Sequence, residues 1–263
     1  MSPERIAWLR AVRRRTAAIR AARGLILVLI FGLWEIAARM GWIDPFIMSS
    51  PSRIIACIGR MIEGRQLFYH IGITCMETAA GFLLGTMLGT VIAIALWWSD
   101  GLSRVFEPYL VVLNSLPKIA LGPVFIVWLG PGVASIITMG LAISIVVTIL
   151  EVHHGMRSTD PDKVRLVESF GGKRWQVLTK VVLPSNLPTI VNALKVNVGL
   201  SWVGVIVGEY LVSRAGIGYL IVYGGQVFQL DLVMAGVIIL GVLAGLMYLL
   251  VSLLEKVLIG GYQ

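Results

Sequence analysis

Long apolar runs, separated by short polar stretches, constrain this chain more than any other feature of its sequence. The last run, residues 232–254, contains no Asp, Glu, Lys or Arg, and it exceeds the roughly 20 residues that cross a bilayer as a helix. Apolar residues make up 57% of the 263 residues and charged residues only 14%, whereas soluble domains average about 45–50% and about 25%. We therefore predict an all-α, polytopic membrane protein without room for a separate soluble catalytic domain.

Six membrane spans are expected from these runs. The third span is expected to be interrupted at Leu116-Pro117 and at Gly122-Pro123, because proline removes a backbone donor and breaks or kinks a helix. Outside the spans, a surface helix is expected to start at Ser49-Ser50-Pro51, with Ile54, Ile55, Ile58, Met61 and Ile62 on one face, and residues 209–230 are expected to form a re-entrant or surface helix. The expected spans are residues 24–40, 70–98, 102–129, 133–150, 189–207 and 232–254.

Lys and Arg are unevenly distributed over the polar stretches. Residues 1–23 contain seven arginines and residues 151–186 contain six Lys or Arg, whereas residues 41–69 and 209–230 contain three and one. Cytoplasmic segments of membrane proteins carry the excess of Lys and Arg, so both termini and the 151–186 segment are expected in the cytoplasm. The basic 1–23 segment either lies on anionic lipid as an amphipathic helix or serves only as an orientation signal.

A polar segment at residues 158–188 separates two apolar spans and has the pattern of a helix–turn–helix. Asp160 and Pro161 suit the N-cap and first position of a helix. Gly171-Gly172 allows the positive φ of a sharp turn. A second helix is expected from Lys173 to Val182, ended by Leu183-Pro184. Such a hairpin is suited to docking on a partner in the aqueous phase; the alternative is a solvated hairpin without a partner.

This polar segment resembles the coupling loop of permease subunits of bacterial ATP-binding-cassette (ABC) importers. The pattern of that family is Glu-Ala-Ala, three residues, Gly, nine residues and Ile-x-Leu-Pro. With the family's Gly on Gly171, Val181-Val182-Leu183-Pro184 falls on the last part. The first part departs from the pattern, because its positions hold Arg165-Leu166-Val167. The ATPase-coupling residues implied by the resemblance are Arg165, Glu168, Phe170, Gly171, Gly172, Lys173, Trp175, Leu183 and Pro184.

A wider resemblance covers residues from about 50 to about 254. Phe170-Gly171-Gly172, Leu187-Pro188, Trp202-Val203-Gly204 and Gly208-Glu209 are similar to the branch that carries nitrate, sulfonates, taurine and thiamine precursors. The resemblance implies the type I permease fold over residues 24–263, with a coupling loop at 151–188. It also implies a homodimer in the bacterial inner membrane, two ATPase subunits that bind ATP-Mg, an extracytoplasmic binding protein, and no cofactor in this chain. The solute expected is a sulfonate-, taurine- or nitrate-like anion, or a thiamine or pyrimidine precursor.

Two groups of polar residues are candidates for the translocation pathway, and each has a second interpretation. Lys118 either neutralises an anionic solute or reaches a lipid headgroup. The polar face on the fifth span either lines the pathway or forms a seam of hydrogen bonds between helices. The glycines of the second span allow close packing, either between two copies or within one. The pathway candidates are Asn114, Ser115, Pro117, Lys118, Asn192, Asn197 and Ser201, and the packing glycines are Gly81, Gly85 and Gly89.

Several other classes of function are less compatible with the sequence. There is no GxxxxGK[ST] nucleotide loop, and His153-His154 lacks zinc-site spacing, so these two are expected to be ordinary loop residues. A catalytic set is not evident, so an intramembrane enzyme is disfavoured. An ion-coupled secondary transporter is the main alternative, but it would need more membrane carboxylates than Glu35, Glu77 and Glu209. The net charge of +8 reflects cytoplasmic Lys and Arg rather than nucleic-acid binding, and Cys57 and Cys75 are expected as free thiols.

Overall fold

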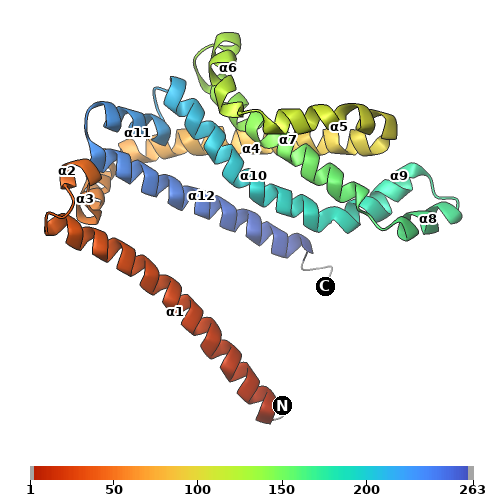
Figure 1. Ribbon diagram of the computed structural model, residues 1–263, viewed down its shortest axis with the longest axis horizontal. Helices are drawn as coiled ribbons and strands as arrows, with labels where there is room; N and C mark the ends of the chain where they lie inside the picture. Colours follow the sequence, from red (N-terminus) through yellow and green to blue (C-terminus); the bar gives the residue numbers. More distant parts are fainter. Residues whose placement is uncertain (1–2, 260–263) are drawn as a thin grey trace.

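The computed structural model describes residues 3–259, and over this range the chain forms helices and connecting turns without a strand (Figure 1). Short segments η1, a 3₁₀ turn, and η2, a π-helical turn, interrupt the α-helical elements. The elements are α1 (Pro3–Arg39), α2 (Pro45–Met48), α3 (Pro51–Glu63), α4 (Gln66–Trp98), α5 (Asp100–Ser115), η1 (Lys118–Leu121), α6 (Gly122–Leu129), α7 (Val133–Arg157), α8 (Pro161–Ser169), α9 (Arg174–Val177), η2 (Leu178–Val182), α10 (Leu183–Val212), α11 (Ile217–Gln226) and α12 (Leu230–Ile259).

Five helices in the described part of the chain are long and apolar enough to cross a membrane. The sixth expected span is a bent pair, in which α5 and the η1–α6 segment meet at 88°. The break falls at Leu116 and Pro117, where a proline interruption was predicted. Over the described residues the count is five spans, or six if the bent pair is one span, and the predicted break at Leu116-Pro117 is confirmed.

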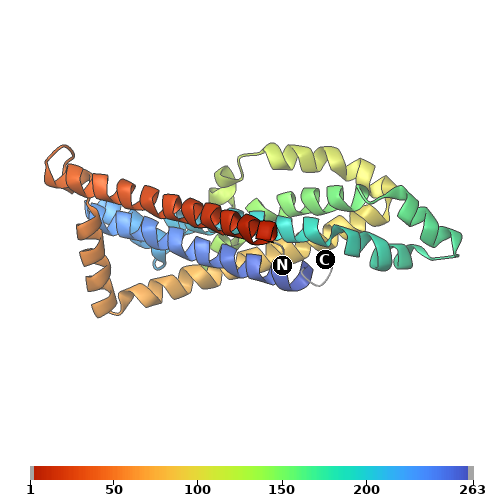
Figure 2. The same ribbon diagram turned by 90° about the horizontal axis from the view of Figure 1, so that it is seen from below.

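The two ends of the elongated bundle carry different elements. The α8–α9 hairpin projects from one end, and α2 and α3 lie at the opposite end in both views (Figures 1 and 2). We call these the hairpin end and the α3 end. Helix α1 leaves the bundle at an angle (Figure 1), and from Val12 onward most of its apolar side chains are exposed. The chain passes from the α3 end to the hairpin end along α4 and returns along α10.

Helices α4, α7 and α10 pack against one another at the centre of the bundle. Three glycines meet where they cross: the Cα atom of Gly140 lies 2.6 Å from the place where a Cβ on Gly204 would lie, and 3.5 Å from that of Gly81. Gly85 faces Ser144 in the same way. The close-packing face of α4 is therefore used within one chain, which decides between the two interpretations of these glycines.

The second helix of the hairpin does not end at Leu183-Pro184, which corrects the prediction from the sequence. It continues through η2 into α10, so that one helix runs from Arg174 to Val212. In the π turn, the Leu183 N–H donates to the Leu178 carbonyl, five residues back. This wider turn changes the hydrogen-bond register before Pro184, so the ring does not meet an intact α-helical turn.

Helix α7 also extends beyond its predicted end. It continues to Arg157, whereas the sequence suggested an end at residue 150. Val152 and Met156 are 1% exposed, and they pack with Val177 and Val182 beneath the hairpin. The polar composition of residues 151–157 was interpreted as a loop, but one face of this last helical part packs on a core that the hairpin supplies.

The α3 end has its own apolar core, built from α3, α4, α11 and α12. Ile54, Cys57 and Met61 of α3 are buried against Ile217 and its neighbours. The predicted apolar face of α3 is only partly correct, because Ile55 is 71% and Ile62 is 45% exposed. Both lie outward, where lipid or another chain would meet them.

Helix α11 is attached to the bundle by hydrogen bonds to its first turn. The N–H of Gly218 donates to Oε2 of Glu209 at 2.5 Å. The N–H of Gly216 donates to Nδ1 of His70 at 2.9 Å, and that of Ile217 to Oγ1 of Thr74 at 2.8 Å. Side chains from α4 and α10 thus satisfy N–H groups that a helix start leaves unpaired. Glu209 is only 1% exposed, and its carboxylate anchors the start of α11. The sequence did not reveal this role.

Candidate functional site

The α8–α9 hairpin is held in shape by capping and by a small core. The Asp160 side chain accepts a hydrogen bond from the Asp162 N–H at 2.9 Å, and Pro161 occupies the first turn, as predicted. Val164 and Val167 pack inward against the apolar cluster around Val177. The hairpin is thus tied to the ends of α4, α7 and α10 while its outer face remains free.

The turn of the hairpin uses its two glycines differently. Gly171 has a φ of +77°, the left-handed conformation that was predicted for one of the pair, and open space surrounds its Cα. A Cβ on Gly172 would lie 2.5 Å from Cγ1 of Val167. The Gly172 N–H also donates to the Val167 carbonyl at 2.9 Å. Gly171 therefore permits the turn, and Gly172 permits its close packing on α8.

Large side chains gather on the exposed surface of the hairpin. Phe170 is 84% and Trp175 is 62% exposed, and Leu166 on α8 is 58% exposed. Arg165 pairs with Asp162 at 3.6 Å in a solvent-exposed contact. Exposed aromatic and apolar side chains at the tip of a projecting element are typical of a docking surface.

The remaining coupling candidates occupy different places. Glu168 is exposed on α8, and the Lys173 N–H donates to Oε1 of Gln176 at 2.7 Å. Leu183 and Pro184 do not belong to the hairpin tip, because they open α10, where Leu183 packs against the apolar cluster. The hairpin therefore brings together the candidates from Arg165 to Trp175, whereas Leu183 and Pro184 lie outside it at the start of α10.

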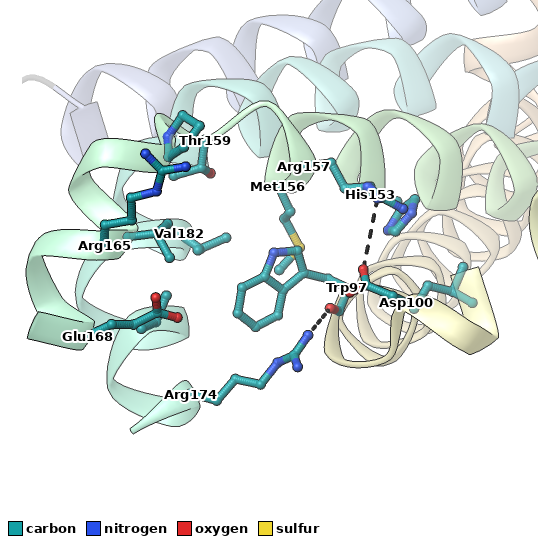
Figure 3. Close-up of a pocket in the computed structure, with 14 residues that line it drawn as sticks. Trp97, Asp100, His153, Met156, Arg157, Thr159, Arg165, Glu168, Arg174 and Val182 are labelled. Atoms are coloured by element: carbon teal, nitrogen blue, oxygen red, sulfur yellow. Dashed lines mark hydrogen bonds and ion pairs between the residues drawn. The ribbon is translucent and has the colours of Figure 1, made fainter. Parts of the chain in front are cut away.

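A cavity of about 520 Å³ lies between the hairpin and the helix ends (Figure 3). Trp97 points into it from the end of α4, and Arg174 approaches the same indole from α9. His153 lies on another wall; it is a buried residue of α7 whose Nε2 lies 2.8 Å from Oγ of Ser103. The expectation that His153 is an ordinary loop residue is thus wrong, because α7 carries it into the protein.

The pathway candidates near the bend lie on exposed surface. Asn114, Ser115 and Pro117 are exposed, and Lys118 is half-buried at the start of η1. The Lys118 Nζ donates to the carbonyl of Asn114 at 3.2 Å and to its Oδ1 at 3.4 Å. This cation is therefore turned back on the end of α5, and it caps the point where the span breaks.

The pathway candidates on α10 divide into two sets. Asn192 is exposed, whereas Asn197 and Ser201 are 0% exposed. Nδ2 of Asn197 donates to Oγ1 of Thr86 on α4 at 3.2 Å and to Oγ1 of Thr148 on α7 at 2.5 Å. Asn197 thus belongs to a seam of hydrogen bonds between three helices, which was the alternative interpretation. Asn197 and Ser201 are buried, so they do not share an exposed surface with the residues at the bend.

No metal centre is apparent in the described part of the chain, where no three His, Cys, Asp or Glu side chains are grouped suitably for one. The cysteines Cys57 and Cys75 are both free thiols, as expected. The features of interest are therefore the hairpin, the cavity behind it and the bent span.

Comparison with known proteins gives a consistent result. A permease protein of Bacillus subtilis (strain 168), named for aliphatic sulfonates transport, is 31% identical over 253 residues, which cover 95% of this chain and 91% of the relative. The formylaminopyrimidine transport permease protein of Halalkalibacterium halodurans is 28% identical and covers 89% of this chain and 93% of its own length. The taurine transport system permease protein of Escherichia coli K12 is 24% identical over 88% of this chain and 86% of the relative.

Solved structures show the same fold at lower sequence identity. A chain of a bacterial ABC transporter for import of the acidic polysaccharide alginate superimposes with a TM-score of 0.65 at 16% identity, covering 95% of this chain and 98% of that chain. A chain of the MetNI methionine ABC transporter gives 0.62 at 18% identity, covering 70% and 92%. The profile of binding-protein-dependent transport system inner membrane components matches residues 81–260. This chain belongs to that family, and it is a membrane-spanning permease subunit of an ABC importer rather than an enzyme.

Proposed function

We propose that this permease carries a small organic anion of the sulfonate type into the bacterial cytoplasm. The relatives named for aliphatic sulfonates and for taurine support this class, since both compounds contain a sulfonate group. Lys118, half-buried beside the break in the bent span, supplies a cation on the expected route. A pyrimidine-type thiamine precursor is the second candidate, supported by the formylaminopyrimidine relative.

The observation that carries the mechanism is the projecting hairpin with exposed Phe170 and Trp175. We propose that it docks in a groove of a separate ABC ATPase, which binds ATP-Mg and moves the hairpin during its cycle. Burial of two aromatic side chains gives such an interface its main affinity. The excess of Lys and Arg at the hairpin and in residues 1–23 supports a cytoplasmic position for this end and for both termini. Residues 24–263 then form the permease domain, with its coupling loop in 151–188.

Two copies of the chain, two ATPases and an extracytoplasmic binding protein make up the proposed importer. Six spans, with the bent pair counted as one, are half of the twelve-span pathway that the family resemblance implies. The exposed bend at Asn114, Ser115, Pro117 and Lys118, together with exposed Asn192, is proposed to face the pathway between the copies. The binding protein would deliver the solute at the α3 end, which is opposite to the hairpin.

The proposal is tested by uptake of labelled taurine, an alkanesulfonate and formylaminopyrimidine in a strain that lacks the gene, with and without the restored permease. Sulfonate uptake that depends on both the permease and its ATPase is expected. Uptake of formylaminopyrimidine alone would exclude the sulfonate class. The mass of the detergent-solubilised complex is expected to fit two permease chains with two ATPase chains, and a ratio of one to two would contradict the homodimer.

A further inference from the structure

The cavity behind the hairpin combines aromatic and basic side chains from separate elements. Its walls come from the ends of α4 and α7, the start of α5, and the hairpin helices α8 and α9. Figure 3 shows the indole of Trp97 standing in the cavity, with side chains of the hairpin on one side and of α7 on the other. The charged side chains that line it are Asp100, Arg157, Arg165, Glu168 and Arg174.

Arg157 lies on one wall and is held there by a buried pair of side chains, Ser103 and His153. Its Nη1 donates to Oγ of Ser103 at 3.0 Å, and this oxygen also lies 2.8 Å from Nε2 of His153. Ser103 is 1% exposed and His153 8%, so these two partners are shielded from water, whereas the Arg157 side chain is 46% exposed. The nearest carboxylate, that of Asp100, is 3.9 Å from Nη2 of Arg157, which is at the limit of an ion pair. Most donors of this guanidinium therefore remain available to a ligand.

Arg174 is held on the opposite wall. Its Nη2 donates to the Trp97 carbonyl at 3.2 Å. Its Cζ lies 5.5 Å from the centroid of the Trp97 ring and 5.9 Å from that of Trp98, which is within the range of cation–π attraction. Two exposed guanidinium groups thus line one cavity, and each already makes one hydrogen bond there, which lowers part of the entropic cost of binding.

The charges of the lining favour a monoanion. Three arginines face two carboxylates, so the lining residues carry one excess positive charge. Arg165 also contacts Asp162, but this pair lies in solvent, where screening makes it weak. Guanidinium groups match phosphate oxygens in geometry and form paired hydrogen bonds with them. A phosphodiester, which carries a single negative charge, fits this balance.

We propose that this cavity binds the phosphate group of an anionic phospholipid and that the bound headgroup braces the coupling hairpin. The bracing role rests on the proposed function, which places this end in the cytoplasm and the ATPase on the hairpin. Trp98, which is 41% exposed, lies beside Arg174 next to the cavity, and Trp residues are enriched at membrane interfaces. Basic pockets between membrane helices on the cytoplasmic side are suited to acidic headgroups.

Lipid retention tests the site without relying on transport. The permease–ATPase complex is placed in nanodiscs that contain equal amounts of phosphatidylglycerol and phosphatidylcholine, and retained lipid is measured by native mass spectrometry. Wild type is expected to retain phosphatidylglycerol preferentially. A basic residue near the surface contributes about 1 kcal/mol to such binding, so Arg174→Gln is expected to lower the preference about fivefold. Arg157→Lys, which keeps the charge but loses the fork, is expected to lower it less than Arg157→Gln.

Lys163→Gln is the matched control, because Lys163 lies on α8 without lining the cavity. It is expected to retain lipid as wild type does. A second arm adds inorganic phosphate to complexes in pure phosphatidylcholine and measures thermal stability. Stabilisation by phosphate without any lipid preference would assign the site to a soluble phosphate and overturn the lipid source. Equal lipid retention by wild type, Arg157→Gln and Arg174→Gln would overturn the site itself.

The bracing role has its own readout. If the headgroup steadies the hairpin, ATPase activity of the wild-type complex is expected to rise with the phosphatidylglycerol content of the nanodiscs, and Arg174→Gln is expected to lose that dependence. Preferential lipid retention without such dependence would keep the site and overturn the bracing. Failure of the ATPase to bind the permease would instead contradict the proposed function, so the two failures are distinguishable.

Discussion

At the scale of single residues, Gly171 is the clearest test of the hairpin. Its φ of +77° costs a residue with a side chain roughly 1–2 kcal/mol, although the space around it is open. Gly171→Glu is therefore expected to leave the protein in the membrane and to weaken docking by tenfold or more, through backbone strain and a clash with the ATPase groove together. ATPase co-purification and solute uptake in the same strain measure both effects.

Gly171→Asn is the matched control for that prediction. Asparagine enters the left-handed region more easily than other residues with a side chain. It is therefore expected to keep more coupling than Gly171→Glu or Gly171→Leu. Normal uptake by Gly171→Glu at normal expression would show that the hairpin does not couple ATP hydrolysis to transport.

Glu209 gives a second prediction at this scale, concerning stability. Glu209→Leu leaves the buried N–H of Gly218 without its acceptor, and an unpaired buried donor costs about 1–3 kcal/mol. Glu209→Gln keeps an oxygen in that place and is expected to cost less. Thermal unfolding of the purified protein measures the difference, and equal midpoints for the two variants would show that the α11 anchor is not important for stability.

These two residues also show what the sequence was able to reveal. Gly171 was recognisable because a glycine pair between two short helical patterns has few other uses. Glu209 was visible only as an acidic residue in an apolar stretch, since its acceptor role depends on α11 folding back on α10. Asn197 and Ser201 were correctly grouped on one face, but the neighbours of that face, Thr86 and Thr148, are far away in the sequence.

At the scale of the helices, the crossing of α4, α7 and α10 depends on small residues. A Cβ on Gly204 would lie 2.6 Å from Cα and 2.9 Å from N of Gly140, and backbone atoms cannot turn aside as a side chain does. Gly204→Ala is expected to cost about 1–3 kcal/mol by overpacking. Gly199→Ala on the same helix meets nothing within 4 Å, so it is expected to be neutral or to stabilise.

Fluorescence-detected thermal melts of the two alanine variants test this comparison directly. The expected order of midpoints is Gly199→Ala at or above wild type, and Gly204→Ala below both. A Gly204→Ala protein as stable as wild type would mean that α7 and α10 separate without loss, contrary to the tight crossing described above.

Helix boundaries were the part of each element that the sequence predicted least well. The apolar runs indicated where helices cross the bilayer, because burial in lipid is a property of each residue. The extension of α7 to Arg157 and the passage of a helix through Pro184 depend on contacts beneath the hairpin and on a π turn. Neither is encoded in a local pattern of apolar residues.

At the scale of the whole molecule, the pathway prediction separates exposed from buried positions. Single cysteines at Ser115 and Ser201 are compared with a water-soluble thiol reagent, in a background without Cys75. The native Cys57 is buried, and burial raises the pKa of its thiol, although Arg60 acts in the opposite direction. Cys57 is therefore expected to contribute little labelling.

Ser115→Cys is expected to react at a rate that changes with the nucleotide state of the ATPase, and Ser201→Cys is expected to stay protected. The comparison is controlled for chemistry, because both substitutions replace a hydroxyl by a thiol. Protection of Ser115→Cys in every nucleotide state would remove the bend from the pathway. Equal labelling of both positions would show that the seam of hydrogen bonds at Asn197 opens to water.

The continuous helix from Arg174 to Val212 gives the molecule a lever arm. The 30 residues of its α10 part span about 45 Å at about 1.5 Å per residue, so a tilt of about 5° at the hairpin would displace the opposite end by about 4 Å. That opposite end carries Glu209, which holds the first turn of α11. A small tilt at the hairpin would therefore move the start of α11 by more than the length of a hydrogen bond. This movement does not require the side chains between the two ends to rearrange.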